Sequence, residues 1–251
     1  MNIFVLACCP GAAADAHCDA HVLKMIVEIT QLLFTFLNRI GVHLPNAYKP
    51  THANHPCCLW ILGGAANFDW LLKLGLALCA RYTDIYGKTH ACEAKLRLIR
   101  AHVDRSTLPM DVGIDEWLLR LSVYGVSDAA IAGCAEKATT LNAPHGCAFG
   151  VLCADAPEAV AMVDGKIDLI ESYRRFYAIK AKERFVMKWH QSSDVPEILE
   201  DAFCNMLPDT PLLAKKQPKR SPVKKEAVKR KRVADVVDDT RLVRIRLQGL
   251  D

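Results

Sequence analysis

Polar side chains follow one line along the apolar stretch 17–40, HCDAHVLKMIVEITQLLFTFLNRI. At helical spacing this line consists of His17, His21, Lys24, Glu28, Gln31, Thr35 and Asn38. Most other positions are apolar, which is typical of a buried helix. Burial would place Lys24 and Glu28 in a low-dielectric setting, as in many functional sites. The alternative is a polar seam that faces solvent and holds an i,i+4 ion pair worth a few tenths of a kcal/mol.

A second set of polar groups lies in the loop 43–58 and the residues just after it. Its segment KPTHANHPCCLW combines a cation, rigid prolines, amide and imidazole donors and an aromatic ring. Such a loop can donate hydrogen bonds to phosphates and stack a ring on a base. The candidate contacts are Lys49, His52, Asn54 and His55. The alternative is a structural loop whose His and Asn side chains satisfy buried backbone groups.

Two further segments are basic. The stretch 167–190 interleaves cations with aromatic residues, and Arg174, Arg175, Lys180 and Lys182 are its candidate phosphate contacts. The tail repeats basic clusters that are typical of nuclear-localisation or nucleic-acid-binding segments. These clusters contain Lys215, Lys216, Lys219, Arg220, Lys224, Lys225, Lys229, Arg230, Lys231 and Arg232. The alternatives are a solvated helix face and a solvated tail without a specific partner.

Other chemistries have weaker support. His17 and His21, and likewise His52, His55 and Cys57, have spacings compatible with zinc, but no paired CxxC or HExxH motif accompanies them. We therefore expect no metal and no other cofactor. The sequence has no P-loop, dinucleotide-binding glycine pattern or nucleophile elbow. Cys57 and Cys58 could supply a thiolate, although adjacent cysteines in a cysteine-rich chain are more often packing residues.

Charge is divided unevenly along the chain. The 251 residues carry a net charge of +4, whereas residues 215–232 hold ten Lys or Arg against one acid, a net of +9. Residues 233–251 contribute −1, which leaves −4 for residues 1–214. The basic character therefore belongs to the tail, and polyanionic partners are expected there.

The eleven cysteines are scattered and odd in number, and several lie in apolar helical patterns. They favour a reduced, intracellular protein, because such thiols serve as small hydrophobes. The opening MNIFVLACC lacks the basic region of a signal peptide. No run of eighteen apolar residues is present, so we expect no transmembrane helix and no membrane partner.

Hydrophobic periodicity predicts an all-α fold. Helices are expected at about 17–40, 67–86, 90–103, 115–124, 128–139 and 167–190, with Gly87 ending the second one. Residues 140–154 should be irregular, and no segment has a convincing strand pattern. The apolar run from Asn2 to Leu6 should dock on the core and fix the N-terminal amine. We expect one helical domain over 1–207, followed by a disordered basic tail over 208–251.

Several of these pieces together resemble a protein family. The start MN-x-F, the pattern K-x-x-x-E-x-x-Q (Lys24, Glu28, Gln31), the motif N-H-P-x-x-x-W from Asn54 to Trp60 and the turn Tyr86-Gly87-Lys88 occur in this order. They resemble small, mostly uncharacterised proteins of phages, bacteria and large DNA viruses. Those proteins look like remote relatives of the pyrimidine-dimer DNA glycosylase of the endonuclease V type. The match covers about 1–90, and a weaker similarity occurs at 171–177. It implies an endonuclease V-like core over about 1–104 with helical additions over 105–207.

The resemblance implies an all-α enzyme that uses no metal. In that family the N-terminal α-amine attacks the sugar C1′, a Schiff base forms, a glutamate supports the chemistry and β-elimination cuts the strand. An α-amine suits this role because its pKa is about 7.7–8.0, against about 10.4 for lysine. Here the amine belongs to Met1, or to Asn2 if Met1 is removed. Asn2 is not one of the small residues that favour removal of Met1. Ala20 stands where the phage relatives usually have lysine. These two departures leave open that the relation is one of fold and DNA binding alone.

These expectations combine into one leading hypothesis, a DNA glycosylase/AP lyase in the host nucleus or a viral factory. Its catalytic residues would be Met1 or Asn2, Lys24 and Glu28. His21 and the loop residues Lys49, His52, Asn54 and His55 would contact the substrate. The helix 167–190 and the tail would bind phosphates. The tail would also bind a nuclear import receptor. The alternatives are a non-catalytic nucleic-acid-binding module and an enzyme that acts on free nucleotides.

Overall fold

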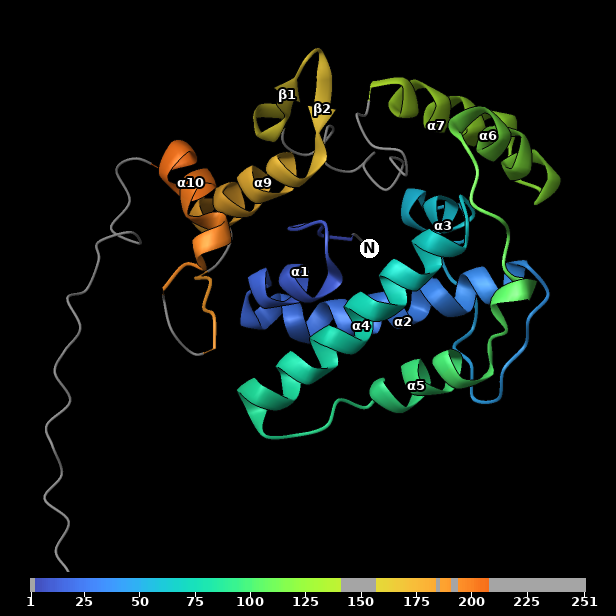
Figure 1. The fold of residues 1–251 in the computed structure, drawn as a ribbon, viewed down its shortest axis with the longest axis horizontal. Coiled ribbons are helices and arrows are strands. Elements are labelled where there is room, and N and C mark those ends of the chain that lie inside the picture. Colours follow the sequence, from blue (N-terminus) through green and yellow to red (C-terminus); the bar gives the residue numbers. More distant parts are fainter. Residues whose placement is uncertain (1–2, 141–156, 184–185, 191–193, 208–251) are drawn as a thin grey trace, which may run out of the picture. The chain divides into compact units, whose positions relative to one another are not determined.

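The computed structural model describes residues 3–140, 157–183, 186–190 and 194–207. These residues are mostly helical, which confirms the predicted all-α class (Figure 1). They all fall within one compact unit, which spans Met1–Ala214. The segment expected to be irregular lies, from residue 141 onward, outside the described residues, and so does the tail 208–251.

The N-terminal part consists of helices α1 to α5, namely α1 (Pro10–Ala16), α2 (Asp19–Arg39), α3 (Pro56–Ile61), α4 (Ala65–Tyr86) and α5 (Glu93–His102). The helix expected at 17–40 is α2, which begins two residues later because the backbone of His17 and Cys18 is extended. Pro10 and Pro56 each start a helix, and Pro56 does so inside the segment that was expected to be a loop. Proline suits this first position because its nitrogen would have no partner there in any case.

The C-terminal part starts with η1 (Arg105–Thr107) and two helices, α6 (Ile114–Val123) and α7 (Asp128–Thr140). After η2 (Pro157–Ala159) come β1 (Ala161–Val163) and β2 (Lys166–Asp168), and then α9 (Leu169–Glu183) and α10 (Glu197–Met206). The bounds of α6 and α7 agree with the prediction within one residue. The left-handed backbone of Gly87, with φ of 64°, ends α4 as expected.

Two sequence predictions are wrong in this part. β1 and β2 form an antiparallel hairpin, with Val163 opposite Lys166, where no strand was expected. Its turn residues Asp164 and Gly165 both have positive φ, as a tight two-residue hairpin turn requires. The helix expected to reach His190 ends at Glu183, because residues 186–190 instead lie against the start of α2. There the Asp19 N–H donates to the Lys188 carbonyl at 2.8 Å.

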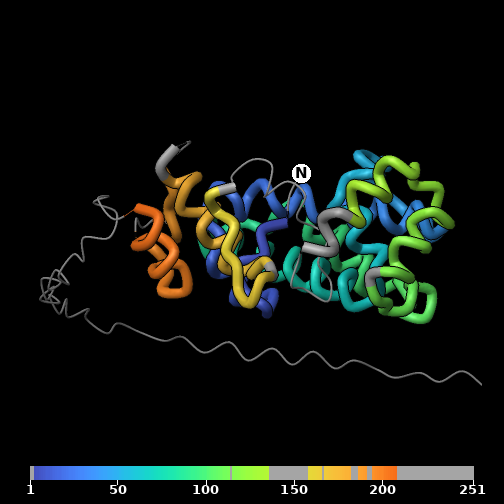
Figure 2. The backbone as a smooth tube through the Cα atoms, turned by 90° about the horizontal axis from the view of Figure 1, so that it is seen from above, coloured from blue at the N-terminus to red at the C-terminus, as the bar shows by residue number. Residues whose placement is uncertain are grey.

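Helix α2 is the centre of the packing, and α4 lies across it (Figures 1 and 2). The buried residues of α2 include Val22, Ile26, Ile29, Leu33 and Phe36, the apolar face visible in the sequence. By length and composition alone, α2 is the one helix among the described residues that could cross a membrane. However, 67% of its apolar window is buried inside the protein, as in a core helix.

A glycine sets the distance between α4 and its neighbours. A Cβ at Gly75 would lie 3.0 Å from Ile29 Cγ2 and 3.1 Å from Leu96 Cδ1. We expect Gly75→Val to lower the free energy of unfolding by about 1–3 kcal/mol, because the added methyl groups overpack this contact. Urea denaturation measures the effect. The control is Gly133→Ala in α7, where a Cβ meets nothing within 4 Å. It should stabilise the protein by up to about 1 kcal/mol, and a similar loss in both variants would contradict the prediction.

Candidate functional site

The first described residues are buried in the core. Ile3 and Leu6 are completely buried, and Phe4 is 5% exposed. Phe4 stacks on His21 of α2, with 4.7 Å between ring centroids, and meets the ring of Tyr177 of α9 edge-on at 5.2 Å. From the same helix, Arg174 Nε donates to the Leu6 carbonyl at 3.0 Å. The N-terminal segment Ile3–Leu6 is therefore held between α2 and α9, as its apolar sequence predicts. Met1 and Asn2 lie outside the described residues.

The charged pair on α2 is only partly buried. Lys24 Nζ lies 3.4 Å from Glu28 Oε1. The Glu28 side chain is 13% exposed, whereas that of Lys24 is 68% exposed. The expected low-dielectric setting thus applies to Glu28 but not to Lys24. Solvent screens the attraction between the two, so the pair contributes little to stability.

The buried thiol of Cys57 lies against the N-terminal segment. Burial raises the pKa of Cys57 to about 12, and the neighbouring Cys58 acts in the same direction. A backbone hydrogen bond from Ile3 opposes this shift, and the charge of Glu28 adds to it. Cys57 is therefore a neutral thiol at ordinary pH and not a nucleophile. The hydrogen bond from Ile3 places the N-terminal segment against the start of α3, and the charge of Glu28 is near enough to act on the same thiol.

His21 lies in the interior rather than at the surface. It is 7% exposed, and its Nδ1 is hydrogen-bonded to the Tyr177 hydroxyl at 2.5 Å. Burial lowers the pKa of His21 to about 3, and the nearby charges of His17, Lys180 and Lys24 lower it further. A neutral ring enclosed by Phe4 and Tyr177 has no access to a substrate in this structure. The expected substrate contact at His21 is thus replaced by a packing role.

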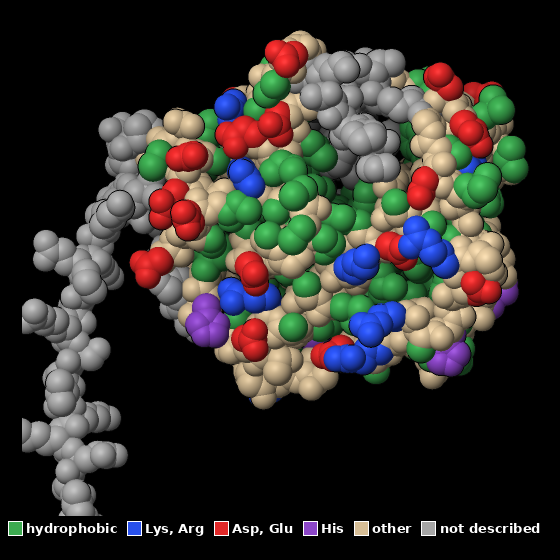
Figure 3. All heavy atoms as spheres, viewed as in Figure 1, with side chains coloured by type: hydrophobic (Ala, Val, Ile, Leu, Met, Phe, Trp, Pro, Cys, Tyr) green, Lys and Arg blue, Asp and Glu red, His purple; other side chains and the backbone are tan. Residues whose placement is uncertain are grey.

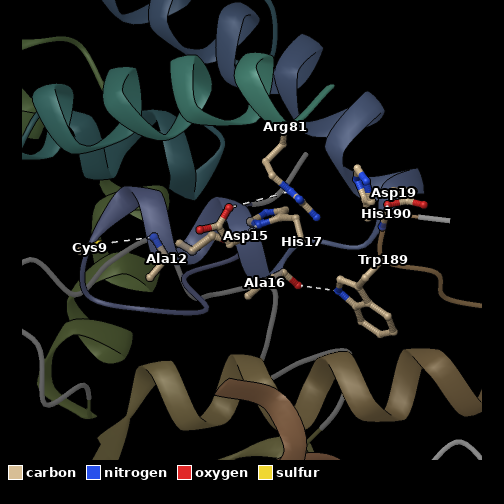
Figure 4. A network of polar contacts seen from close by, with 10 residues as sticks. Cys9, Ala12, Asp15, Ala16, His17, Asp19, Arg81, Trp189 and His190 are labelled. Atoms are coloured by element: carbon tan, nitrogen blue, oxygen red, sulfur yellow. Dashed lines mark hydrogen bonds and ion pairs between the residues drawn. The ribbon is translucent and has the colours of Figure 1, made fainter. Parts of the chain in front are cut away.

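A second buried histidine ends α1. His17 Nδ1 donates to the Ala13 carbonyl at 2.6 Å, while its Nε2 is buried without a hydrogen-bond partner among the described residues. Burial lowers the pKa of His17 to about 4. Figure 4 shows Arg81 beside this ring, in an ion pair with Asp15 at 3.9 Å.

The same figure shows how the segment 186–190 is attached. Trp189 Nε1 donates to the Ala16 carbonyl at 2.9 Å, and the His190 N–H donates to Asp19 Oδ1 at 2.7 Å. Together with His17, these contacts surround the junction of α1 and α2. They form a structural network that fixes where α2 begins.

The loop residues are separated from His21. Thr51 and Thr35 are joined by hydrogen bonds of 3.1 and 3.2 Å, which place the loop along the C-terminal half of α2. Fourteen residues of helix separate His21 from Thr35, which is about 21 Å. The structure therefore does not gather the predicted substrate contacts into one place.

Within the loop, most predicted contacts have local partners. His55 caps α3 by accepting from the Cys57 N–H at 3.2 Å, and Asn54 accepts from Arg39 Nη2 at 2.8 Å. The exposed His52 bonds to Thr51 Oγ1 at 2.7 Å through its Nδ1. Lys49 is exposed. The structural interpretation of the loop accounts for His55, which bonds to a backbone group, whereas Asn54 bonds to the Arg39 side chain, and Lys49 and His52 are accessible to a ligand.

The cations of α9 also make internal contacts. Besides the Arg174 bond to Leu6, Arg175 pairs with Glu171 at 3.0 Å, and Lys180 Nζ lies 4.9 Å from the centre of the Phe176 ring. Their expected role as free phosphate contacts is therefore weakened. The side chain of Lys182 and the ten basic residues predicted in the tail lie outside the described residues.

No family model matches the chain, and no curated protein or solved structure matches it either. Among the described side chains, no group of three or more His, Cys, Asp or Glu is placed to hold a metal ion.

Sequence reasoning did not identify Phe4, Cys57 and Tyr177 as the residues that hold the N-terminal segment. A signal for Tyr177 was present, because Tyr173, Phe176 and Tyr177 form an apolar face on an otherwise basic helix. Nothing in the sequence shows that Cys57 lies beside Ile3, because that contact joins segments more than fifty residues apart.

Proposed function

We propose that this protein processes DNA, and that in the sharpest form of the hypothesis it is a DNA glycosylase/AP lyase that uses its N-terminal amine. One observation carries the proposal: the chain enters the core at Ile3, which is hydrogen-bonded to Cys57, and the charge of the largely buried Glu28 acts on the same thiol. Two residues of extended chain span at most about 7 Å. The α-amine is therefore tethered within this distance of Ile3, and the proposed mechanism requires the Glu28 carboxylate to lie within its reach.

The chemistry needs only these two groups. The amine nitrogen attacks the sugar C1′, and the damaged base departs with the electrons of its glycosidic bond. At an abasic site the amine instead condenses with the aldehyde and releases water. The resulting Schiff base acidifies the C2′ hydrogen, which a carboxylate such as Glu28 removes, and the 3′ phosphate leaves by β-elimination.

The Lys24–Glu28 pair supports these roles. The Glu28 side chain is 13% exposed, and the exposed Lys24 ammonium lies 3.4 Å from its carboxylate. A cation near an amine favours the neutral, nucleophilic form of the amine. The basic tail would supply affinity for phosphates and a segment for a nuclear import receptor.

The deciding experiment is borohydride trapping of the full-length protein on a duplex that carries an abasic site. We expect a covalent adduct that mass spectrometry assigns to the N-terminal residue. Glu28→Gln should slow strand cleavage by about 10²-fold or more, because general acid–base catalysis contributes about that much.

The matched control is Glu171→Gln, which removes another partly buried glutamate from an i,i+4 pair, that with Arg175. It should leave the cleavage rate unchanged. A folded protein that binds the duplex without forming an adduct would reject the lyase mechanism.

Such a result would leave a non-catalytic nucleic-acid-binding module as the better account. The internal contacts of Arg174, Arg175 and Lys180 favour this second function, because they shift phosphate binding from α9 to the tail.

A further inference from the structure

Four cations that the sequence did not single out lie together on α4, α5 and η1. They are Lys73, Arg97, Arg100 and Arg105, which we call the cation strip. Figure 3 shows Lys and Arg side chains gathered over α4 and α5 on the face that it presents. All four residues are exposed.

Two contacts establish the order of these residues. Gly75 of α4 packs against Leu96 of α5, and Arg105 forms an ion pair with Asp69, one turn before Lys73. Lys73 and Arg100 therefore lie between these two contacts. Arg97 and Arg100 are three residues apart and share a face of α5. The result is a line of positive charge rather than a scattered set.

The arginines at the two ends of the strip are held in place. Arg97 donates to Glu93 Oε1 through Nε at 2.8 Å, with Nη2 2.5 Å from the same oxygen, and Arg105 pairs with Asp69. Their side chains nevertheless stay 65% and 62% exposed. A guanidinium has five N–H donors, so both groups keep donors that face solvent. Side chains ordered in advance lose less entropy when they bind a ligand.

The two middle cations of the strip differ from the arginines at its ends. Lys73 and Arg100 have no ion-pair partner in the described part of the chain. The neighbouring Asp104 is turned toward η1, where its carboxylate accepts from the Ser106 N–H at 2.9 Å. Counting Asp69, Glu93 and Asp104, the four cations leave a net charge of +1.

We propose that the cation strip binds the sugar–phosphate backbone of DNA. This inference rests on the proposed function and locates the DNA on the body of the protein. Arg97 and Arg100 lie about 4.5 Å apart along the axis of α5, and Arg105 follows after the extended residues Val103 and Asp104, so the three arginines can reach different phosphates of one strand. A line of guanidinium groups with outward donors suits phosphate oxygens, which arginine recognises by paired hydrogen bonds.

Lysine footprinting tests the proposal on the full-length protein. The probe is a 20-base-pair duplex with one tetrahydrofuran abasic analogue, and the readout is the acetylation rate of each lysine by mass spectrometry. The duplex should slow acetylation of Lys73 at least fivefold at low salt and should leave the exposed Lys88 and Lys188 unchanged. Protection should disappear at high salt.

A pair of double variants gives a second readout. Lys73→Gln with Arg100→Gln should reduce the slope of log K against log salt by about 2, one for each lost phosphate contact. Lys88→Gln with Lys188→Gln removes the same charge elsewhere and should leave the slope unchanged.

The outcomes separate the two hypotheses. Duplex binding with Lys73 unprotected, or equal changes of slope in both double variants, would overturn the cation strip alone. Protection of Lys73 by polyglutamate and not by the duplex would also overturn it, in favour of an acidic protein partner. No binding of the duplex by the full-length protein would overturn the proposed function as well.

Discussion

Tyr177→Ala should lower the free energy of unfolding by roughly 3–5 kcal/mol, because it removes a large ring from the centre of the core. Tyr177 is completely buried on α9. Its ring meets those of Phe4 and His21 at 5.2 and 5.1 Å, and its hydroxyl bonds to His21 Nδ1. The cavity would open where α9, the N-terminal segment and α2 meet.

Urea denaturation tests this expectation through a lower midpoint with an unchanged slope. Tyr177→Phe separates the ring from the hydroxyl. It removes the hydrogen bond to His21 Nδ1 and should cost about 1–3 kcal/mol. If the alanine variant cost no more than the phenylalanine variant, the ring would not be packed as described. If the proposed function holds, the alanine variant should also lose trapping activity, because α9 holds the segment that carries the amine.

The second large effect is a loss of stability in mild acid. Burial lowers the pKa of His17 to about 4 and that of His21 to about 3. In the unfolded chain both should titrate near 6.5. Below that pH the unfolded chain therefore binds up to two more protons than the folded protein, and the free energy of unfolding falls as the pH falls. Around pH 5 the two histidines together contribute a slope of about 2.7 kcal/mol per pH unit.

Urea midpoints measured at pH 7.5, 6 and 5 would show this dependence. Above pH 7 both histidines are neutral in the folded and the unfolded chain, so their contribution should be constant. His21→Gln keeps a polar group near Tyr177 but cannot take up a proton. It should remove about half of the slope between pH 6 and 5, and an unchanged slope in this variant would show that His21 does not titrate as its burial implies.

The sequence alone determined the helical framework. Apolar residues at a period of 3.6 predicted α2, α4, α6 and α7, and Gly87 ended α4 because the left-handed backbone there suits glycine. These signals are local, since a helix closes its hydrogen bonds within a few residues. The hairpin was missed because strands of three residues are too short to show an alternating pattern, although Asp164-Gly165 is a typical hairpin turn.

Only the tertiary structure decided which polar residues are accessible. His21 and Lys24 are neighbours on the line of polar side chains along α2, yet α9 covers His21 while Lys24 remains 68% exposed. The sequence of α2 does not show that α9 covers His21, because Tyr177 follows His21 by 156 residues. In the same way, α9 uses its cations for internal contacts, and α4 and α5 bring their cations together at the surface. Helical periodicity specifies which residues share a face, whereas long-range packing determines whether that face meets protein or solvent.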